Sequence, residues 1–388
     1  MKNSGSTELH TRLLSRRAAI FSLAALAGGY LVACGGDDDD ETALDTADSG
    51  ASPEPEGTLE STVTADATAE ATPEPTAAAP TSVLDATPAW TRLAAAGPSA
   101  RRDHSLVATA DGSSVILFGG RGQDGPLNDA WLYDVAADTW MQIEGGPSAR
   151  FGHNAVFDAA GSRMILFGGQ AGPNFFNDTW SFDGTWLQLN LAGPPSPRYG
   201  AGAAITQNDV FISHGFTDSG RFDDTWQMPL EGDAWGDQSP TSGPRPVERC
   251  LLRTVADSER GRIFLFGGQT DSDPFLGDLW VLDLTVDSWS EIGQSTAPAA
   301  RNLYSLVAVD EPAALLFGGR AEDGALNDLW VLDFLTDSWL QVAADGEAPS
   351  GRSGHDAAWL TGQHSMLVFG GRDAGQTLLN ETWRLDFA

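Results

Sequence analysis

Six arginines recur once per repeat along residues 89–388 of this 388-residue sequence. A guanidinium group presents its N–H donors in a planar fork that fits carboxylates and sulfates, so a ring of such groups favours acidic ligands. A scaffold residue that hydrogen-bonds loop carbonyls and ties neighbouring repeats together would recur in the same way. Both interpretations stay open for this set, which we call the ring arginines: Arg101, Arg150, Arg198, Arg249, Arg301 and Arg352.

A second and less regular set of arginines follows the glycine-rich part of three repeats. The corresponding positions of the other repeats hold Gln170, Phe216 and Gln269. Because only half of the repeats carry the charge, scaffold requirements explain this set less readily, and we predict that it contacts an anionic glycan, peptide or protein. We call this set the mouth arginines: Arg121, Arg320 and Arg372.

Histidine stands three residues after the ring arginine in three of the six repeats. Neighbouring imidazoles can bind a metal such as Zn²⁺. No carboxylate is fixed beside them in sequence to orient the rings, which favours a packing role, and no other cofactor is predicted. These weak metal candidates are His104, His153 and His355.

Other catalytic patterns are missing from the sequence. It contains no G-x-S-x-G, no H-E-x-x-H and no phosphate-binding loop, and no acid–base pair is visible. The acidic stretches 271–273 and 322–324 lack the full spacing of a calcium loop. A formal net charge of −32 repels phosphate backbones, so nucleic acid is excluded as a partner. The chemistry therefore favours binding over catalysis.

The elements that must position these residues are repeats spaced 46 to 53 residues apart. Each contains an apolar run that ends in a glycine pair or its remnant, the last glycines being Gly120, Gly169, Gly215, Gly268, Gly319 and Gly371. About ten residues later comes a tryptophan with an acid two positions before it, and a second tryptophan usually follows nine residues on. Twelve of the 13 tryptophans fall into two ladders of six, with Trp359 left over.

Each repeat reads as four short strands, a to d, because its apolar runs are four to seven residues long and separated by turn residues. In the first repeat we expect strands at 105–109, 114–119, 130–134 and 139–143. Six such antiparallel sheets arranged radially form a β-propeller. The last repeat ends at Ala388 before its second tryptophan, and Trp90 precedes the first repeat. We therefore predict that an N-terminal strand completes the sixth blade and closes the ring.

The glycine pairs, the two tryptophan ladders and the arginine before each strand a resemble the kelch repeat over essentially all of residues 89–388. The resemblance implies an all-β, six-bladed propeller. The third repeat departs from the pattern, because His214 replaces the first glycine and Pro229 stands where the other repeats have Asp. Both arginine sets lie in the d-to-a and b-to-c connections, which share one face of an antiparallel blade, and the ring arginines should surround the channel mouth.

The resemblance offers three functions. In peptide-binding kelch domains, arginines at similar places contact acidic ligands, which favours an interaction module. Six-bladed kelch-like proteins of the bacterial envelope include sialic acid mutarotases, which makes a cofactor-free carbohydrate enzyme the alternative. A copper radical oxidase similar to galactose oxidase is remote, since the repeats offer only Tyr133, Tyr199 and Tyr304 with Cys250 as metal-site components.

The N-terminal segment has the order of an export signal. Residues 1–34 carry a net charge of +3, with a basic start and an apolar run from Ala18 to Val32 that is shorter than a permanent membrane helix. The string 31–34, Leu-Val-Ala-Cys, resembles a bacterial lipobox, whose cysteine is acylated. We therefore predict a signal peptide at 1–33 and a lipid anchor on Cys34 at the bacterial cell envelope, outside the cytoplasm. Arg16 and Arg17 leave the export route open between the twin-arginine and the general pathway.

The segment 34–88 is predicted to be a disordered spacer. Residues 35–88 hold 14 acidic residues, no Lys or Arg and no aromatic residue. Such a segment cannot bury enough apolar surface to offset its chain entropy. It would hold the domain at 89–388, which itself carries a net charge of −21, away from the membrane.

Overall fold

The computed structural model describes residues 82–94 and 96–387. The predicted signal peptide, the predicted lipidation site at Cys34 and the spacer up to residue 81 lie outside the described residues. All regular elements of the described residues are β-strands. Among them there is no helix long and apolar enough to cross a membrane.

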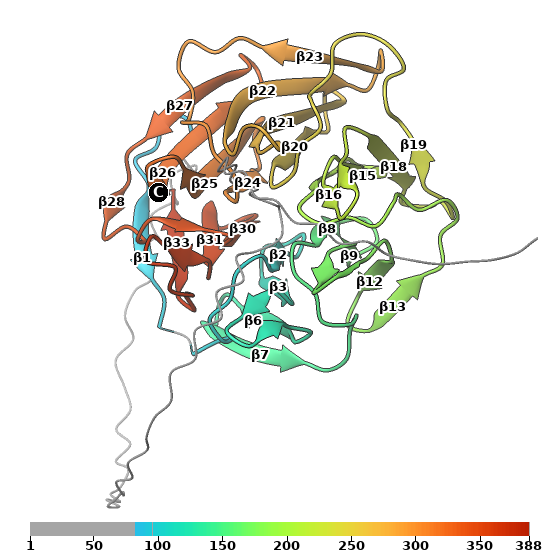
Figure 1. The fold of residues 1–388 in the computed structure, drawn as a ribbon. Coiled ribbons are helices and arrows are strands. Elements are labelled where there is room, and N and C mark those ends of the chain that lie inside the picture. The colour runs from blue at the N-terminus through green and yellow to red at the C-terminus, as the bar shows by residue number, and fades with distance from the viewer. Residues whose placement is uncertain (1–81, 95, 388) are drawn as a thin grey trace, which may run out of the picture. The chain divides into compact units, whose positions relative to one another are not determined.

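Six sheets form six blades around a common axis, as the repeats predict, and all strand pairs in them are antiparallel except one at the outer edge of blade 6 (Figure 1). The strands form because their residues are β-branched, aromatic or leucine and are separated by turn residues. Blade 1 contains β2 (Ser105–Ala108), β3 (Ser114–Phe118), β6 (Ala130–Asp134) and β7 (Thr139–Ile143). Blade 2 contains β8 (Asn154–Asp158), β9 (Arg163–Phe167), β12 (Thr179–Phe182) and β13 (Trp186–Leu189). Blade 3 contains β14 (Gly202–Ile205), β15 (Asp209–Ser213), β18 (Thr225–Pro229) and β19 (Gly236–Asp237).

The other three blades follow in chain order. Blades 4, 5 and 6 contain β20 (Arg253–Asp257), β21 (Arg262–Gly268), β22 (Leu276–Asp283) and β23 (Ser288–Ile292); β24 (Ser305–Ala308), β25 (Ala313–Ala321), β26 (Gly324–Asp333) and β27 (Ser338–Val342); and β30 (Asp356–Leu360), β31 (Ser365–Phe369), β33 (Thr382–Asp386), β1 (Ala89–Arg92) and β28 (Asp345–Gly346). The four strands predicted for blade 1 are confirmed to within one residue at each end.

Short two-residue strands extend the b-to-c connections on one face, and the sequence pattern did not predict them. Three of these pairs are hairpins within one connection: β4 (Arg121–Gly122) with β5 (Gly125–Pro126), β10 (Gln170–Ala171) with β11 (Asn174–Phe175), and β16 (Phe216–Thr217) with β17 (Gly220–Arg221). In blade 6, β32 (Arg372–Asp373) of the b-to-c connection pairs instead with β29 (Arg352–Ser353) of the d-to-a connection.

Strand a is the innermost strand of every blade, and the second strands b and third strands c lie farther out (Figure 1). The six inner strands contact one another in the order β2, β8, β14, β20, β24 and β30, and β30 contacts β2 again. The ring is therefore closed, and the inner strands line a central channel.

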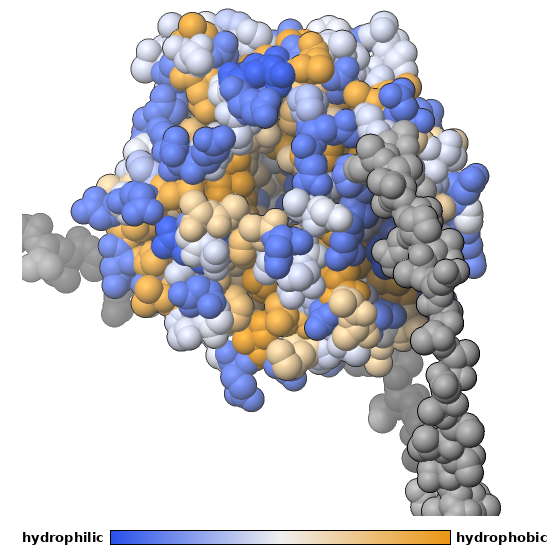
Figure 2. Space-filling model, turned by 180° about the vertical axis from the view of Figure 1, so that it is seen from behind, coloured by the Kyte–Doolittle hydropathy of each residue, from blue (hydrophilic) through white to orange (hydrophobic). Residues whose placement is uncertain are grey.

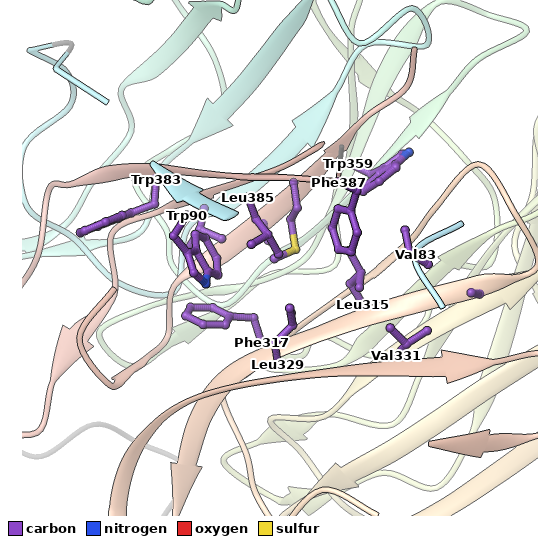
Figure 3. Packing of buried hydrophobic residues seen from close by; sticks show 14 residues of the cluster. Val83, Trp90, Leu315, Phe317, Leu329, Val331, Trp359, Trp383, Leu385 and Phe387 are labelled. Atoms are coloured by element: carbon purple, nitrogen blue, oxygen red, sulfur yellow. The ribbon is translucent and has the colours of Figure 1, made fainter. Parts of the chain in front are cut away.

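The predicted closure by an N-terminal strand is confirmed. Strand β1 pairs antiparallel with β33, with Trp90 opposite Leu385, and supplies the outer strand of blade 6. Trp90 is buried and packs on Phe317 of blade 5, with ring centroids 4.9 Å apart (Figure 3).

The folded domain begins before residue 89. Val83 is fully buried in the cluster that joins blades 5 and 6 (Figure 3). Its backbone N–H and the hydroxyl of Ser82 each donate to the Glu311 carboxylate over 2.6 Å. The boundary predicted at 88/89 therefore lies several residues too late, because a short apolar anchor inside an acidic segment gave no repeat signal.

The second tryptophan of each blade packs on the ring at the end of strand b in the preceding blade. The five Trp–Phe centroid distances run from 4.9 to 5.3 Å and join the pairs Trp140–Phe369, Trp186–Phe118, Trp235–Phe167, Trp339–Phe266 and Trp90–Phe317. Aromatic side chains of this size dominate core energetics, so this ladder joins the blades.

In blade 3 a histidine replaces the phenylalanine at the end of strand b in this contact. Where the other blades read Phe-Gly, this blade has Ser213 followed by His214, and His214 adopts the left-handed φ of +62° that the glycines adopt elsewhere. The imidazole is fully buried and meets Trp289 of blade 4 edge-on, with centroids 6.3 Å apart. The imidazole of His214 therefore packs against the next blade's tryptophan, as phenylalanine does in the other blades.

Candidate functional site

The ring arginines lie in the protein interior. All six are between 0 and 1% exposed. Arg150 shows the common arrangement, because its Nη1 and Nη2 donate to the two carboxylate oxygens of Asp178 over 2.6 and 2.9 Å. Its Nη1 also donates to the carbonyl of Gly168 and its Nε to the carbonyl of Ser148. Every hydrogen-bonding edge of this guanidinium group is therefore occupied.

The same ion pair recurs in all six blades, at 2.6 Å in five of them and 2.9 Å in the sixth. The carboxylate is the acid that precedes the first tryptophan, and it also accepts a hydrogen bond from that indole. The acids are Asp129, Asp178, Asp224, Asp278, Asp328 and Glu381.

These contacts correct the prediction that the ring arginines contact a ligand. Their donors already bond within the blade, and no part of them faces solvent, so they belong to the scaffold. Burial raises the pKa of Asp178, but the bonds from Arg150 and Trp180 outweigh it and hold that pKa below its usual value. The acid two positions before the first tryptophan of each repeat is visible in the sequence. The sequence did not predict that this acid forms an ion pair with the ring arginine.

The glycine pairs dock one blade against the next. Gly119 has a φ of +60°, and a Cβ on it would stand 2.8 Å from the carbonyl oxygen of Arg150 in the neighbouring blade. The N–H of Gly120 donates to that same oxygen over 2.9 Å. The pair is needed because this close backbone approach leaves no room for a side chain.

A cyclic hydrogen-bond ring closes the channel at the arginine-bearing end. In each blade the residue two positions after the ring arginine donates its N–H to the carbonyl of its counterpart in the preceding blade, over 2.7 to 3.2 Å. The six members, which we call the mouth ring, are Asp103, Gly152, Gly200, Leu251, Leu303 and Gly354. All have positive φ. The channel mouth expected on this face is therefore sealed by backbone.

The mouth arginines surround this seal on three consecutive blades, 5, 6 and 1. Arg320 is exposed, Arg121 is half-buried and Arg372 is buried except for 8% of its surface. Their backbones pair with Asn302, Arg102 and Ser353, which follow the ring arginines. The structure thus brings the three arginines to one half of this face, with Arg320 and Arg121 the accessible members.

Aromatic and amide side chains occupy the other half. Phe151 and Tyr199 pack edge-to-face with centroids 5.4 Å apart, and the half-buried Phe175 and Phe216 pack at 5.8 Å. The guanidinium of Arg121 lies 5.5 Å from the Phe151 ring centroid, which joins the two halves. The face therefore offers cationic and aromatic surface side by side.

Acidic side chains border this face at the hairpin tips. Asp124 in blade 1 and Glu322 and Asp323 in blade 5 are exposed there. Arg102 pairs with Asp103, and Arg221 of blade 3 pairs with Asp271 of blade 4. The electropositive area is therefore local, confined to the surroundings of Arg121 and Arg320.

The three candidate metal-binding histidines are packing residues. Each stacks edge-on against a phenylalanine of the adjacent blade, as in His153 on Phe118 at 5.4 Å. Burial and then the nearby Arg150 lower the pKa of His153 to about 3. The described residues contain no group of three or more His, Cys, Asp or Glu side chains arranged to hold a metal ion. This contradicts the weak zinc hypothesis for His104, His153 and His355.

The tyrosines of the remote copper hypothesis are also used in packing. The Tyr133 hydroxyl donates to Asp138 over 2.7 Å, and Tyr304 is fully buried with its hydroxyl donating to the Phe266 carbonyl. Burial raises the pKa of Tyr199 and of Tyr304. These phenols lie in three different blades, so they do not form a common ligand set.

Comparison with known proteins gives one matching family model. The model described as the KLHDC2/KLHL20/DRC7 Kelch-repeats domain matches residues 83–257 and 235–388. The two matches together span all six blades, and they begin at Val83, where the structure also places the start of the folded domain.

Curated relatives are similar at lower coverage. A leucine-zipper-like transcriptional regulator 1 homolog of Drosophila melanogaster is 27% identical over 213 residues, 52% of this chain and 21% of that protein. Adagio-like protein 3 of Oryza sativa subsp. japonica is 27% identical over 320 residues, 78% of this chain and 43% of that protein. Kelch domain-containing protein 1 of Homo sapiens is 26% identical over 143 residues, 36% of this chain and 34% of that protein. The chain thus spans less than half the length of these relatives.

Proposed function

The chain belongs to the Kelch-repeat family, and we propose that its propeller binds an acidic segment of a partner protein or glycan through the face that carries Arg121 and Arg320. Kelch propellers are commonly protein-interaction modules. The finer statement, that the partner is anionic, rests on the placement of the arginines.

The observation that carries this proposal is the state of Arg320. It is exposed, and it forms no ion pair with any carboxylate among residues 82–387 that the structure describes. The ring arginines, by contrast, are all paired internally. An exposed guanidinium group in a domain of charge −21 is available to pair with an external carboxylate or sulfate.

The neighbouring aromatic cluster supports a peptide in particular. Phe175 and Phe216 are half-buried at the same face. Binding energy in protein interfaces concentrates in arginine and aromatic residues with a polar rim around them. An acidic segment with an apolar residue beside its carboxylates fits both halves of the face.

The buried histidines cannot act as acid or base for a ligand bound on this face. The histidines that might have transferred protons lie beneath the mouth ring and are 0 to 3% exposed. A general acid or base must come within hydrogen-bond reach of its substrate. The proposal is therefore one of binding.

We further propose that the domain is held at the outside of a bacterial membrane by a lipid on Cys34. The support is the order of the basic, apolar and small residues in the sequence. Mass spectrometry of the membrane fraction should find an acylated Cys34 at the N-terminus, and Cys34→Ser should release the protein. A membrane-bound Cys34→Ser variant would contradict this anchor.

The binding proposal is tested by fluorescence anisotropy with labelled glutamate-rich peptides, with and without a phenylalanine, and with heparin fragments. Arg121→Ala with Arg320→Ala should abolish binding, and the affinity of the wild-type chain should fall with added salt. The matched control, Arg260→Ala with Arg384→Ala, removes two partly exposed arginines elsewhere and should leave the affinity unchanged. Equal loss in both double variants would show that only net charge matters and would overturn the proposed face.

A further inference from the structure

The end of the channel opposite the mouth ring is open. A cavity of about 410 Å³ lies between the six inner strands and extends to the a-to-b turns, where Ala110, Ser258 and Asp310 line it. Figure 2 shows a hollow near the middle of one face of the domain, surrounded by hydrophobic and hydrophilic residues. Cavities of a few hundred cubic ångströms are the usual size of small-molecule sites.

The inner strands build this cavity in layers, because they start at equivalent positions. The first residue of each strand stands four places after the ring arginine, and these six residues are Ser105, Asn154, Gly202, Arg253, Ser305 and Asp356. Five of the six are polar. The residues that follow along these strands, toward the open end of the channel, are mostly alanine, valine and leucine. Of the six first residues, Asn154, Arg253 and Asp356 line the cavity, which is therefore an apolar funnel with polar side chains at its closed end.

Two charged residues in this layer are incompletely bonded. The Nη2 of Arg253 reaches Asp356 Oδ1 only at 3.5 Å, and its Nε donates to the Tyr304 carbonyl over 3.2 Å. Among the described residues no hydrogen bond involves its Nη1. The side chain of Arg253 is 26% exposed and that of Asp356 is 16% exposed. A buried charged group is costly unless its hydrogen-bonding capacity is filled, so this pair has capacity for a further partner.

The contacts of Asp356 add a second polar position. Its Oδ2 accepts the N–H of Leu106 over 3.0 Å, and its Oδ1 contacts Arg253 only at 3.5 Å. The backbone of Ala357 also donates to this carboxylate. An arginine with free donors beside a carboxylate with a free acceptor matches a ligand that presents a carboxylate next to a hydroxyl or ammonium group. The small side chains of Ala155 and Ala203 leave room for the rest of such a molecule.

We infer that this funnel is a small-molecule site for a carboxylate that carries a neighbouring hydroxyl or ammonium donor, with Arg253 binding the carboxylate and Asp356 the donor. Sugar acids and amino acids both have this chemistry. The site is separate from the face of Arg121 and Arg320, because the mouth ring closes the channel between them. The two proposals can therefore fail independently.

The test is calorimetric titration of the full chain with galacturonate, L-serine and glucose at millimolar concentrations. We expect galacturonate or serine to bind and glucose, which lacks the carboxylate, not to bind. Galacturonate offers only hydroxyl donors, so its binding assigns a hydroxyl group. Serine carries both donors, and binding of glycine in its place would assign the ammonium group. Asp356→Asn and Arg253→Gln should each weaken binding at least about tenfold, since each removes one charge-assisted hydrogen bond. Arg320→Ala should leave binding unchanged.

A third variant guards against misfolding of the charge variants. Ala203→Leu fills the funnel while it leaves Arg253 and Asp356 in place, and it should also abolish binding at an unchanged unfolding midpoint. Glucose binding as tight as that of galacturonate would overturn the role of Arg253. Failure of both carboxylates to bind the wild-type chain, or their undiminished binding to Ala203→Leu, would overturn the site.

Discussion

His214 of blade 3 meets Trp289 of blade 4 edge-on, with ring centroids 6.3 Å apart, where the other five junctions place a phenylalanine against a tryptophan. The exchange involves two adjacent residues. Ser213 stands where the other blades have phenylalanine, and its hydroxyl contacts the imidazole Nδ1 of His214 over 2.6 Å. His214 fills the space from the position of the first glycine.

This complementarity predicts strong coupling between Ser213 and His214. His214→Gly alone should destabilise the domain by about 2–4 kcal/mol, because it leaves a cavity beside Trp289. Ser213→Phe alone should also destabilise it, since the phenyl and imidazole rings compete for one site. The double variant restores the Phe-Gly sequence and should lie within about 1 kcal/mol of the original stability.

Urea unfolding of the four proteins measures this coupling as a double-mutant cycle. Additive losses in the double variant would show that the two positions act independently, and the proposed replacement of Phe by His would be wrong.

The sequence was sufficient for the fold because the signals repeat. Trp140, Trp186 and their counterparts recur at fixed distances, and Trp90 completes the count, so the number of blades and the closure followed from periodicity. Val83 was missed because a single apolar anchor carries no period. The short hairpins were missed because two-residue strands leave no pattern.

The site was harder to predict because repetition does not separate scaffold from function. Arg150 and Arg320 have the same side chain on the same face, yet one is 1% exposed and the other is exposed. Only the structure shows that Asp178 accepts two hydrogen bonds from the guanidinium group of Arg150. Arg253 and Asp356 lie 103 residues apart, and only the closed ring brings them together.

The buried Arg–Asp pairs should be among the most sensitive points of the domain. Arg150→Lys keeps the charge but cannot make the two-point contact with Asp178 or reach both carbonyls. Breaking a buried pair of this kind costs about 3–5 kcal/mol, less the screening that the partly exposed carboxylate receives. Thermal unfolding should show a large drop in the melting temperature.

Arg320→Lys provides the matched control on the same face. It should change the unfolding free energy by no more than about 0.5 kcal/mol, because the side chain is exposed. A similar loss in both lysine variants would contradict the division into scaffold and surface arginines.

The buried histidines predict a loss of stability in mild acid. Burial, and then a nearby arginine, lowers the pKa of His153, His214 and His355 to about 3. The unfolded chain, with a histidine pKa of about 6.5, binds more protons, so their contribution is full above pH 6.5 and falls as the pH decreases toward 3. At pH 5 each of the three should cost about 2 kcal/mol relative to pH 7.

Measurement of the unfolding free energy between pH 7 and pH 5 isolates this effect. Asp129 and its counterparts have lowered pKa values, so their loss begins only below about pH 5. The burial of His104 also lowers its pKa well below the usual value, so four histidines contribute and His355→Gln should reduce the slope by about one quarter. An unchanged slope would show that His355 does not take part in the acid response.

The closing strand predicts that two deletions of the N-terminal region differ sharply in effect. Deleting residues 86–93 removes β1 and Trp90, exposes β33 and leaves Phe317 without its tryptophan partner. Deleting residues 40–80 leaves β1, β33 and the Trp90–Phe317 contact in place. Trp90→Ala tests the anchor alone and should cost about 3–5 kcal/mol, because Trp90 is 6% exposed in the cluster that also contains Val83. Melting temperatures give the comparison: the 40–80 deletion should match the full chain, and both changes at β1 should fall well below it. Equal melting temperatures for the two deletions would mean that the ring is held closed without its N-terminal strand.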